Sequence, residues 1–158
     1  MNQLFQLLLV TFLTFTSTAF AAYDVSESTS SRTAADPVLA SAHAALARED
    51  WAGAQADLLK ALAVAPQNAD HHNLYAYAIR KGQNPNMALV FKHYGEALRI
   101  NPKHRGAHEY VGEAYLMVGD LPKAKQHLAA LDKLCFMPCV EHTDLKKAIV
   151  AYEAKRKP

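Results

Sequence analysis

The sequence predicts an all-α protein in which pairs of helices form an array that a final helix closes. Apolar residues recur three or four positions apart through most of the chain, which is the spacing of one helix face. Short turns rich in glycine, asparagine and proline separate these stretches. Related features return after 34 or 36 residues, which is typical of a repeat array. We therefore expect about three helical pairs over residues 36–138, followed by a capping helix with a basic tail over residues 139–158.

The N-terminus has the features of a secretory signal peptide over residues 1–21. An apolar run at residues 4–15 precedes Ala19-Phe20-Ala21, which fits an A-x-A cleavage site. The run is shorter than the about 20 apolar residues that a membrane-spanning helix needs. We expect cleavage and export from a bacterial cytoplasm to the periplasm or the medium, with retention as an uncleaved anchor as the alternative. Residues 22–35 are rich in Ser and Thr, and their low apolar content predicts a flexible leader.

Capping residues and prolines mark the first two helical pairs. Asp36 followed by Pro37 predicts the start of the first helix, and the second helix is expected over residues 54–65. Trp51 is expected to pack over the turn between these two helices. In the second pair the helices are expected at residues 68–82, with Asn68 or Asp70 as the cap, and at residues 87–100. A turn rich in Gly, Asn and Pro joins them.

The third pair occupies residues 101–131. Gly119-Asp120 ends its first helix, and Pro122 suits the first turn of the second. Small residues are expected where two helices approach closely, at Gly112, Ala114 and Ala124. The apolar positions of the two helices are Ala107, Tyr110, Val111, Ala114, Tyr115, Val118, Ala124, Leu128 and Leu131. A last helix over residues 141–155 carries Leu145, Ala148, Ile149 and Tyr152 at helical spacing.

The repeated positions resemble those of the tetratricopeptide repeat (TPR) family, whose helix–turn–helix unit has 34 residues. Ala54, Ala88 and Ala124 each follow a turn and open a helix. The distance from Ala88 to Tyr94 exceeds the family pattern by two residues, so we place an insertion between them. Further matching residues are Ala61-Leu62 with Pro66, Ala97-Leu98 with Pro102, and Gly112 with Tyr115. With its C-terminal C-x3-C, the chain is similar to small secreted bacterial TPR proteins.

The resemblance implies that the first helix of each pair lines a groove that binds a peptide or a protein. Arg80 would pair there with a carboxylate of the ligand, and Glu109 and Glu113 with a basic residue, which favours a peptide of mixed charge. The alternative for Arg80 and Lys81 is that they only offset the helix dipole. The predicted groove residues are His43, Asn73, Tyr77, Arg80, Lys81, Glu109 and Glu113.

The chain has two cysteines, Cys135 and Cys139. Two cysteines this close should form a disulfide in an oxidising compartment, and the bond would hold the capping helix to the array. A redox-active pair is the alternative, because Cys139 would lie near a helix N-terminus, which lowers the pKa of a thiol. A copper site is a further alternative, since thiolate and thioether ligands suit Cu(I). Its additional ligands would be His104, His108, Met137 and His142.

The sequence contains no nucleotide-binding loop, nucleophile elbow or paired-carboxylate motif, so it predicts a non-enzymatic protein without a cofactor. The chain has 17 Lys and Arg against 15 Asp and Glu, and this balance is too even to indicate a nucleic-acid partner. No membrane association is expected after cleavage of the signal. We therefore expect a protein-interaction module or assembly adaptor of the bacterial cell envelope. A thiol-redox or copper-handling protein is the alternative.

Overall fold

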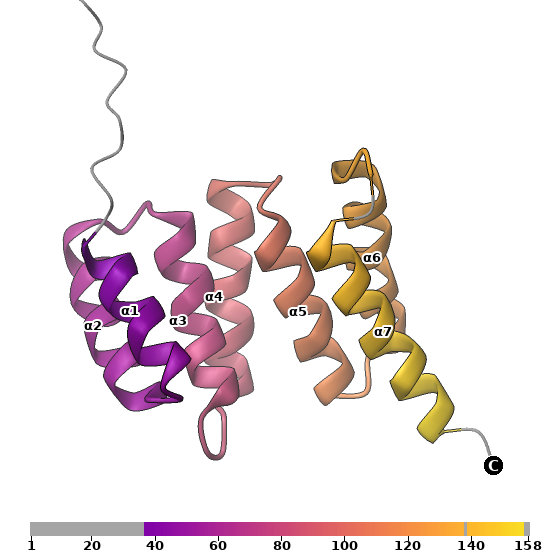
Figure 1. Ribbon diagram of the computed structural model, residues 1–158, viewed down its shortest axis with the longest axis horizontal. Coiled ribbons are helices and arrows are strands. Elements are labelled where there is room, and N and C mark those ends of the chain that lie inside the picture. The colour runs from indigo at the N-terminus through magenta and orange to yellow at the C-terminus, as the bar shows by residue number, and fades with distance from the viewer. Residues whose placement is uncertain (1–36, 138, 157–158) are drawn as a thin grey trace, which may run out of the picture. The chain divides into compact units, whose positions relative to one another are not determined.

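The computed structural model describes residues 37–137 and 139–156 (Figure 1). These residues form seven α-helices and no β-strand, which confirms the predicted all-α fold. The predicted signal peptide, the leader, the cap Asp36 and the turn residue Pro138 lie outside the described residues. The helices are α1 (Pro37–Ala47), α2 (Trp51–Val64), α3 (Ala69–Lys81), α4 (Met87–Ile100), α5 (Arg105–Met117), α6 (Leu121–Leu134) and α7 (Val140–Lys155).

Side-chain caps determine where most of these helices begin. Asn68, rather than Asp70, caps α3 by accepting a hydrogen bond from the backbone N–H of His71 at 3.1 Å. Such a cap satisfies one of the backbone donors that the first helical turn leaves without a partner. Asp50, Asn86, His104 and Asp120 cap α2, α4, α5 and α6 in the same way.

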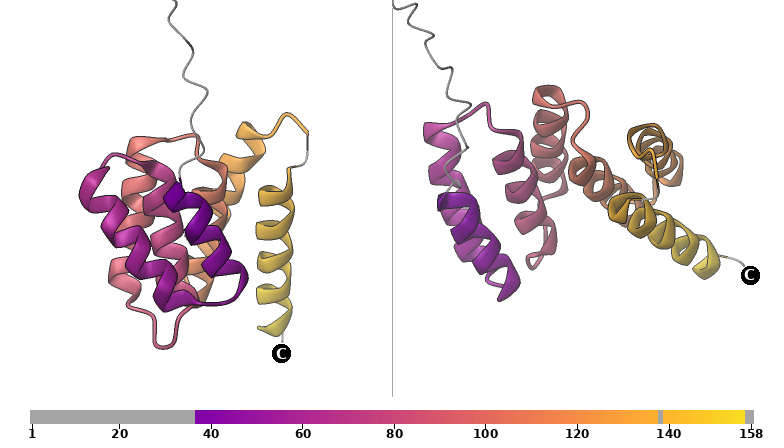
Figure 2. Two further views of the ribbon diagram at one scale, coloured as in Figure 1. Left: turned by 60° about the vertical axis from the view of Figure 1, so that its left-hand side comes forward. Right: turned by 45° about the horizontal axis from the view of Figure 1, so that its top comes forward.

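The helices pack in sequence order as an array with short turns. The pairs α1–α2, α3–α4 and α5–α6 are in contact, and α2–α3 and α4–α5 connect one pair to the next. The first helices also meet each other, since α3 contacts both α1 and α5. This arrangement is consistent with a TPR-like array. Helix α7 lies beside α5 and α6, as both views of Figure 2 show.

A glycine allows the last helix to approach α5 closely. A Cβ atom on Gly112 would lie 2.7 Å from a methyl carbon of Leu145, which is fully buried on α7. The small residue at this position therefore has the predicted role, although its neighbour is α7 and not the paired helix α6. Buried side chains of α5, α6 and α7 surround the contact: Leu116, Ala124, Leu131, Leu145 and Ile149.

The predicted register of the second pair is wrong by two residues. Ala88 is exposed, and the fully buried position that matches Ala54 and Ala124 is taken by Val90. Each of the three residues follows its helix cap by four positions, since the caps are Asp50, Asn86 and Asp120. The alanines at positions 54 and 124 do not indicate Val90, because an apolar side chain other than alanine can also fill this buried position.

The two extra residues lie in a turn and not inside helix α4. Four residues, 82–85, separate α3 from the cap of α4, whereas two residues separate α1 from the cap of α2 and α5 from the cap of α6. An insertion in a surface turn leaves the buried face of the next helix unchanged, which explains why it is tolerated. The prediction of an insertion between Ala88 and Tyr94 is therefore corrected.

The prediction that Val118 belongs to the apolar face of α5 is also wrong. Val118 is 49% exposed and caps the helix instead of contributing to the core. The chain turns at Gly119, whose φ of 83° lies in the left-handed region that favours glycine. This turn directs Val118 away from the partner helix and brings Asp120 to the start of α6.

Candidate functional site

The first helices of the three pairs and the start of α7 line a cavity of about 400 Å³. We call it the groove. It contains three of the predicted groove residues, His43 of α1, Asn73 of α3 and Glu109 of α5. Two residues of α7 that were not predicted, Val140 and Glu141, also line it. The remaining lining residues are Leu39, Asp70, Leu74, Gly106 and Tyr110.

Asn73 and Glu109 occupy the same position on the first helices of successive helical pairs. Each lies five residues after the cap of its helix, Asn68 for α3 and His104 for α5. Both side chains are buried, with 5% of Asn73 and 9% of Glu109 exposed. The packing of α3 against α5 therefore brings an amide and a carboxyl group to the same cavity.

Neither group has its hydrogen-bonding capacity satisfied within the described residues. The side-chain oxygen of Asn73 is buried without a hydrogen-bond partner there. The Glu109 carboxyl likewise makes no hydrogen bond or ion pair with a described residue. Buried polar groups in proteins are nearly always paired, so the unpaired oxygen of Asn73, in the same cavity as the Glu109 carboxyl, indicates a place where a donor from outside the chain can bind.

Burial is the main cause that raises the pKa of Glu109 to about 8. Nearby carboxylates repel a negative charge on Glu109 and act in the same direction, whereas Arg80 acts against them. These carboxylates belong to Glu113, Asp144 and Glu141. A large fraction of Glu109 is consequently protonated at neutral pH, and a cation in the groove would favour its ionised form.

Arg80 is engaged inside the protein and is not free for a ligand. Its guanidinium lies 2.7 Å from the carboxylate of Glu113, and its side chain is 7% exposed. Its Nε–H donates a hydrogen bond to the hydroxyl of Tyr94 at 3.3 Å. The guanidinium also lies over the rings of Tyr77 and Tyr110, at 5.3 and 5.7 Å from their centroids. The expectation that Arg80 and Glu113 face a ligand as free charges is therefore corrected: they pair with each other.

Tyr77 and Lys81 belong to an aromatic row that joins three helices. The Tyr77 ring is 4.7 Å from that of Tyr110 on α5, and it meets Trp51 on α2 in an edge contact at 6.2 Å. Lys81 places its ammonium 5.7 Å above the Trp51 ring. Trp51 thus packs against α3, whereas the sequence predicted that it covers the turn before α2.

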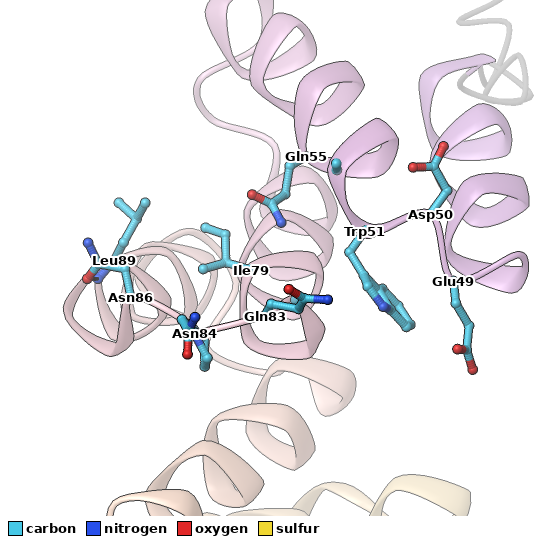
Figure 3. A pocket seen from close by; sticks show the side chains of 12 residues that line it. Glu49, Asp50, Trp51, Gln55, Ile79, Gln83, Asn84, Asn86 and Leu89 are labelled. Carbon is cyan, nitrogen blue, oxygen red and sulfur yellow. Dashed lines mark hydrogen bonds between the residues drawn. The ribbon is translucent and has the colours of Figure 1, made fainter.

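A second hollow, of about 540 Å³, lies beside the long turn between α3 and α4. Figure 3 shows Trp51 and Gln55 of α2 on one side of it, and Gln83 and Asn84 of the turn on another. Gln55 donates a hydrogen bond to the carbonyl of Ala78 at 3.1 Å, which connects α2 to α3 next to the hollow. The sequence signal for this feature was the run of Gly, Asn and Pro at residues 82–86, which predicted the turn but not the hollow.

The disulfide predicted between Cys135 and Cys139 is confirmed, with an S–S distance of 2.06 Å. Cys135 caps the end of α6 and Cys139 caps the start of α7, so the bond joins the two helices directly. The Cα atoms are 5.8 Å apart, a distance at which a disulfide forms readily.

The histidines considered as copper ligands have other partners. His104 lies 3.1 Å from Asp70, and His142 lies 2.7 Å from Asp132. His108 contacts His127, with 3.0 Å between their Nδ1 atoms. Over residues 37–137 and 139–156, no group of three or more His, Cys, Asp or Glu side chains is placed to hold a metal ion.

Two equivalent histidine pairs were not predicted from the sequence. The Nδ1 atoms of His72 and His93 are 2.8 Å apart, and Nε2 of His72 is 3.0 Å from the carbonyl oxygen of Pro66. Because a carbonyl only accepts, Nε2–H of His72 donates to it, and Nδ1–H of His93 donates to His72. His108, His127 and Pro102 repeat this arrangement. The repeat spacing of 36 and 34 residues was the signal that could have found both pairs.

No family model matches the chain, and no curated protein matches it. Among the residues that the structure describes, none of the helices has the length and apolar character needed to span a membrane.

Proposed function

We propose that this protein is a non-enzymatic interaction module of the TPR type, which binds an extended peptide or protein segment in the groove. The observation that carries the proposal is the cavity of about 400 Å³ to which α1, α3, α5 and α7 all contribute. A chain lying across the first helices would contact every helical pair, which is how repeat arrays bind their ligands.

The chemistry of the groove supports a peptide ligand. Apolar walls from Leu39, Leu74 and Val140 alternate with the polar groups of Asn73 and Glu109. A peptide offers both apolar side chains and backbone donors, so it complements such a surface better than a purely apolar molecule does.

The proposed setting is the bacterial cell envelope. The signal-like sequence at residues 1–21 supports export, and the Cys135–Cys139 disulfide supports an oxidising compartment. An exported module without a catalytic motif fits an adaptor that brings other proteins together. N-terminal sequencing of the exported protein tests the setting: a mature chain that begins at Ala22 supports it, and an intact Met1 on the membrane fraction overturns it.

Gly106 provides the variant that tests the binding site. A Cβ atom on this residue would have ordinary contacts, at 3.5 Å from His104 and 3.6 Å from Asn73, so a larger side chain would extend into the groove. We expect Gly106→Phe to abolish capture of partners from the exported fraction, while Gly106→Ala retains it. Gly95→Phe is the matched control, because Gly95 lies on the exposed side of α4 with no heavy atom within 4 Å of its Cβ position.

Circular dichroism and the thermal midpoint must show that all three variants are folded. If Gly106→Phe keeps every partner of the wild type, the groove is not the binding site. If Gly95→Phe also loses the partners, the site extends to the opposite face of the array and the proposal is wrong.

A thiol-redox function is the second candidate, favoured by the position of Cys139 at the start of α7. After reduction, its thiolate would lie at the positive end of a helix dipole, which stabilises the negative charge. Titration of the pair against glutathione separates the two functions, because a structural bridge stays oxidised at reduction potentials where a working pair opens.

A further inference from the structure

The groove combines the hydrogen-bond acceptors of Asn73 and Glu109 with apolar walls. We propose that it holds a lysine or arginine side chain of the bound peptide, with the basic group between Asn73 and Glu109. This inference rests on the proposed function and names the residue type that the groove selects.

The first argument is the supply of acceptors. The oxygen of Asn73 is buried without a partner among the described residues, and the Glu109 carboxyl makes no hydrogen bond or ion pair with them. Both therefore accept from a ligand that brings N–H donors. An ammonium group carries three donors and a guanidinium carries five, and neither carries an acceptor.

The second argument is that the Glu109 carboxyl has no cation beside it to balance its charge, as judged from the described residues. Arg80 pairs with Glu113 at 2.7 Å, and Arg105 lies 3.6 Å from Glu141. Arg80 and Arg105 thus already have carboxylate partners, whereas Glu109 has no cationic partner among the residues that the structure describes. Burial raises the pKa of Glu109 to about 8, and a cation bound beside this carboxyl would favour its ionised form. A ligand carboxylate at the same place would meet further negative charge.

The third argument is the shape of the surroundings. Leu39, Leu74 and Val140 supply apolar surface, and Tyr110 supplies an aromatic ring. The aliphatic stem of a lysine or arginine packs on such walls while its charged end reaches the acceptors. Val140 is 67% exposed, so the groove is open to solvent on the side of α7, where the peptide backbone can pass.

Selection from a display library of random dodecapeptides tests this inference on the full chain. On the wild-type protein we expect enriched peptides to share a Lys or Arg at one position. In a synthetic peptide from that set, replacing the basic residue with norleucine keeps the stem and removes the charge. The replacement should weaken binding to the wild type at least about tenfold, because a charge-assisted hydrogen bond is lost.

The Glu109→Gln variant identifies the residue that recognises the charge. Glutamine keeps the size of the side chain and removes its charge. On this variant we expect the replacement of the basic peptide residue by norleucine to weaken binding less than about twofold. The two changes together form a double-mutant cycle. Glu96→Gln is the matched control, since it removes one negative charge from α4 at an exposed pair with Arg99. In that control the tenfold preference for the basic residue should remain.

The possible results separate the two proposals. Enriched peptides without a basic position, or a preference that Glu109→Gln leaves unchanged, overturn the basic subsite and leave peptide binding in the groove intact. A selection that enriches no peptide on the wild type overturns the proposed function and the subsite together. A preference lost equally in Glu96→Gln shows a general effect of net charge, which also overturns the subsite.

Discussion

The guanidinium of Arg80 on α3 and the carboxylate of Glu113 on α5 lie 2.7 Å apart and join two successive helical pairs. Arg80 is almost completely buried and also contacts the hydroxyl of Tyr94 and the rings of Tyr77 and Tyr110. The pair therefore connects α5 to the buried side chains of α3 and α4. We therefore expect both residues to contribute to the stability of the protein.

Removing one partner of this pair should destabilise the protein strongly. Glu113→Ala leaves the buried guanidinium without its carboxylate, and a loss of about 3 kcal/mol in the free energy of unfolding is expected. Urea denaturation followed by circular dichroism measures it. Glu96→Ala is the control, because its pair with Arg99 is exposed and its removal should leave the urea midpoint nearly unchanged. Equal midpoints for Glu113→Ala and the wild type would contradict the role given to Arg80.

The same substitution at two glycines should have opposite effects. Gly112→Ala places a methyl group 2.7 Å from a methyl carbon of the buried Leu145, so the Leu145 side chain or α7 must shift, at a cost of about 1–3 kcal/mol. Gly95→Ala meets nothing within 4 Å and removes a flexible residue from helix α4, which should stabilise the protein by about 0.5–1 kcal/mol. The thermal midpoints of the two variants, compared with that of the wild type, measure these changes in stability. A rise for both would show that α7 does not press on Gly112.

The histidine pairs should make the protein less stable in acid. Burial, followed by the charge of the partner histidine, lowers the pKa values of His93 and His127 from 6.5 to about 4. Between these pH values the unfolded chain binds more protons than the folded chain, so stability falls as the pH decreases from 6.5 towards 4. His93→Asn keeps an N–H donor near the position of Nδ1 and should reduce this dependence, as measured by thermal midpoints across that range. If the thermal midpoint of His93→Asn depends on pH as strongly as that of the wild type, His93 is not a source of the acid sensitivity.

Glu109 should have the opposite dependence. Because its pKa rises from 4.5 to about 8, the folded chain binds more protons than the unfolded chain between these values, and stability falls as the pH increases through this range. Glu109→Gln removes this ionisable group, so the stability of the variant relative to the wild type should increase from pH 5 to pH 8. Thermal midpoints at the two pH values measure the difference. A constant difference would mean that Glu109 ionises in the folded state as it does in water.

The disulfide should stabilise the end of the array in particular. It closes a short loop between α6 and α7, for which the chain-entropy model predicts about 2 kcal/mol. In the double variant Cys135→Ser, Cys139→Ser we expect faster hydrogen exchange in α7 and unchanged exchange in α1 to α4. Acceleration throughout the array would show that the bond supports the whole fold rather than the capping helix.

Local sequence chemistry by itself determined most of the helix boundaries and the disulfide. Asn68, one of the two caps predicted for α3, does cap it, because a cap involves only residues three positions apart. The bond between Cys135 and Cys139 follows from their short separation in the chain. The turn at Gly119 needs a left-handed residue, and that requirement is also local.

Only the tertiary structure decided which side chains face each other across helices. Repeat spacing placed Arg80 and Glu113 on the same face, but it did not show that they pair with each other instead of with a ligand. It also could not distinguish Ala88 from Val90 at the buried position, because a turn can absorb two residues without changing helix periodicity. Helix α7 adds Val140 and Glu141 to the groove through packing against α5. Such contacts join residues far apart in sequence, so they depend on the distances and angles between helices, which periodicity does not specify.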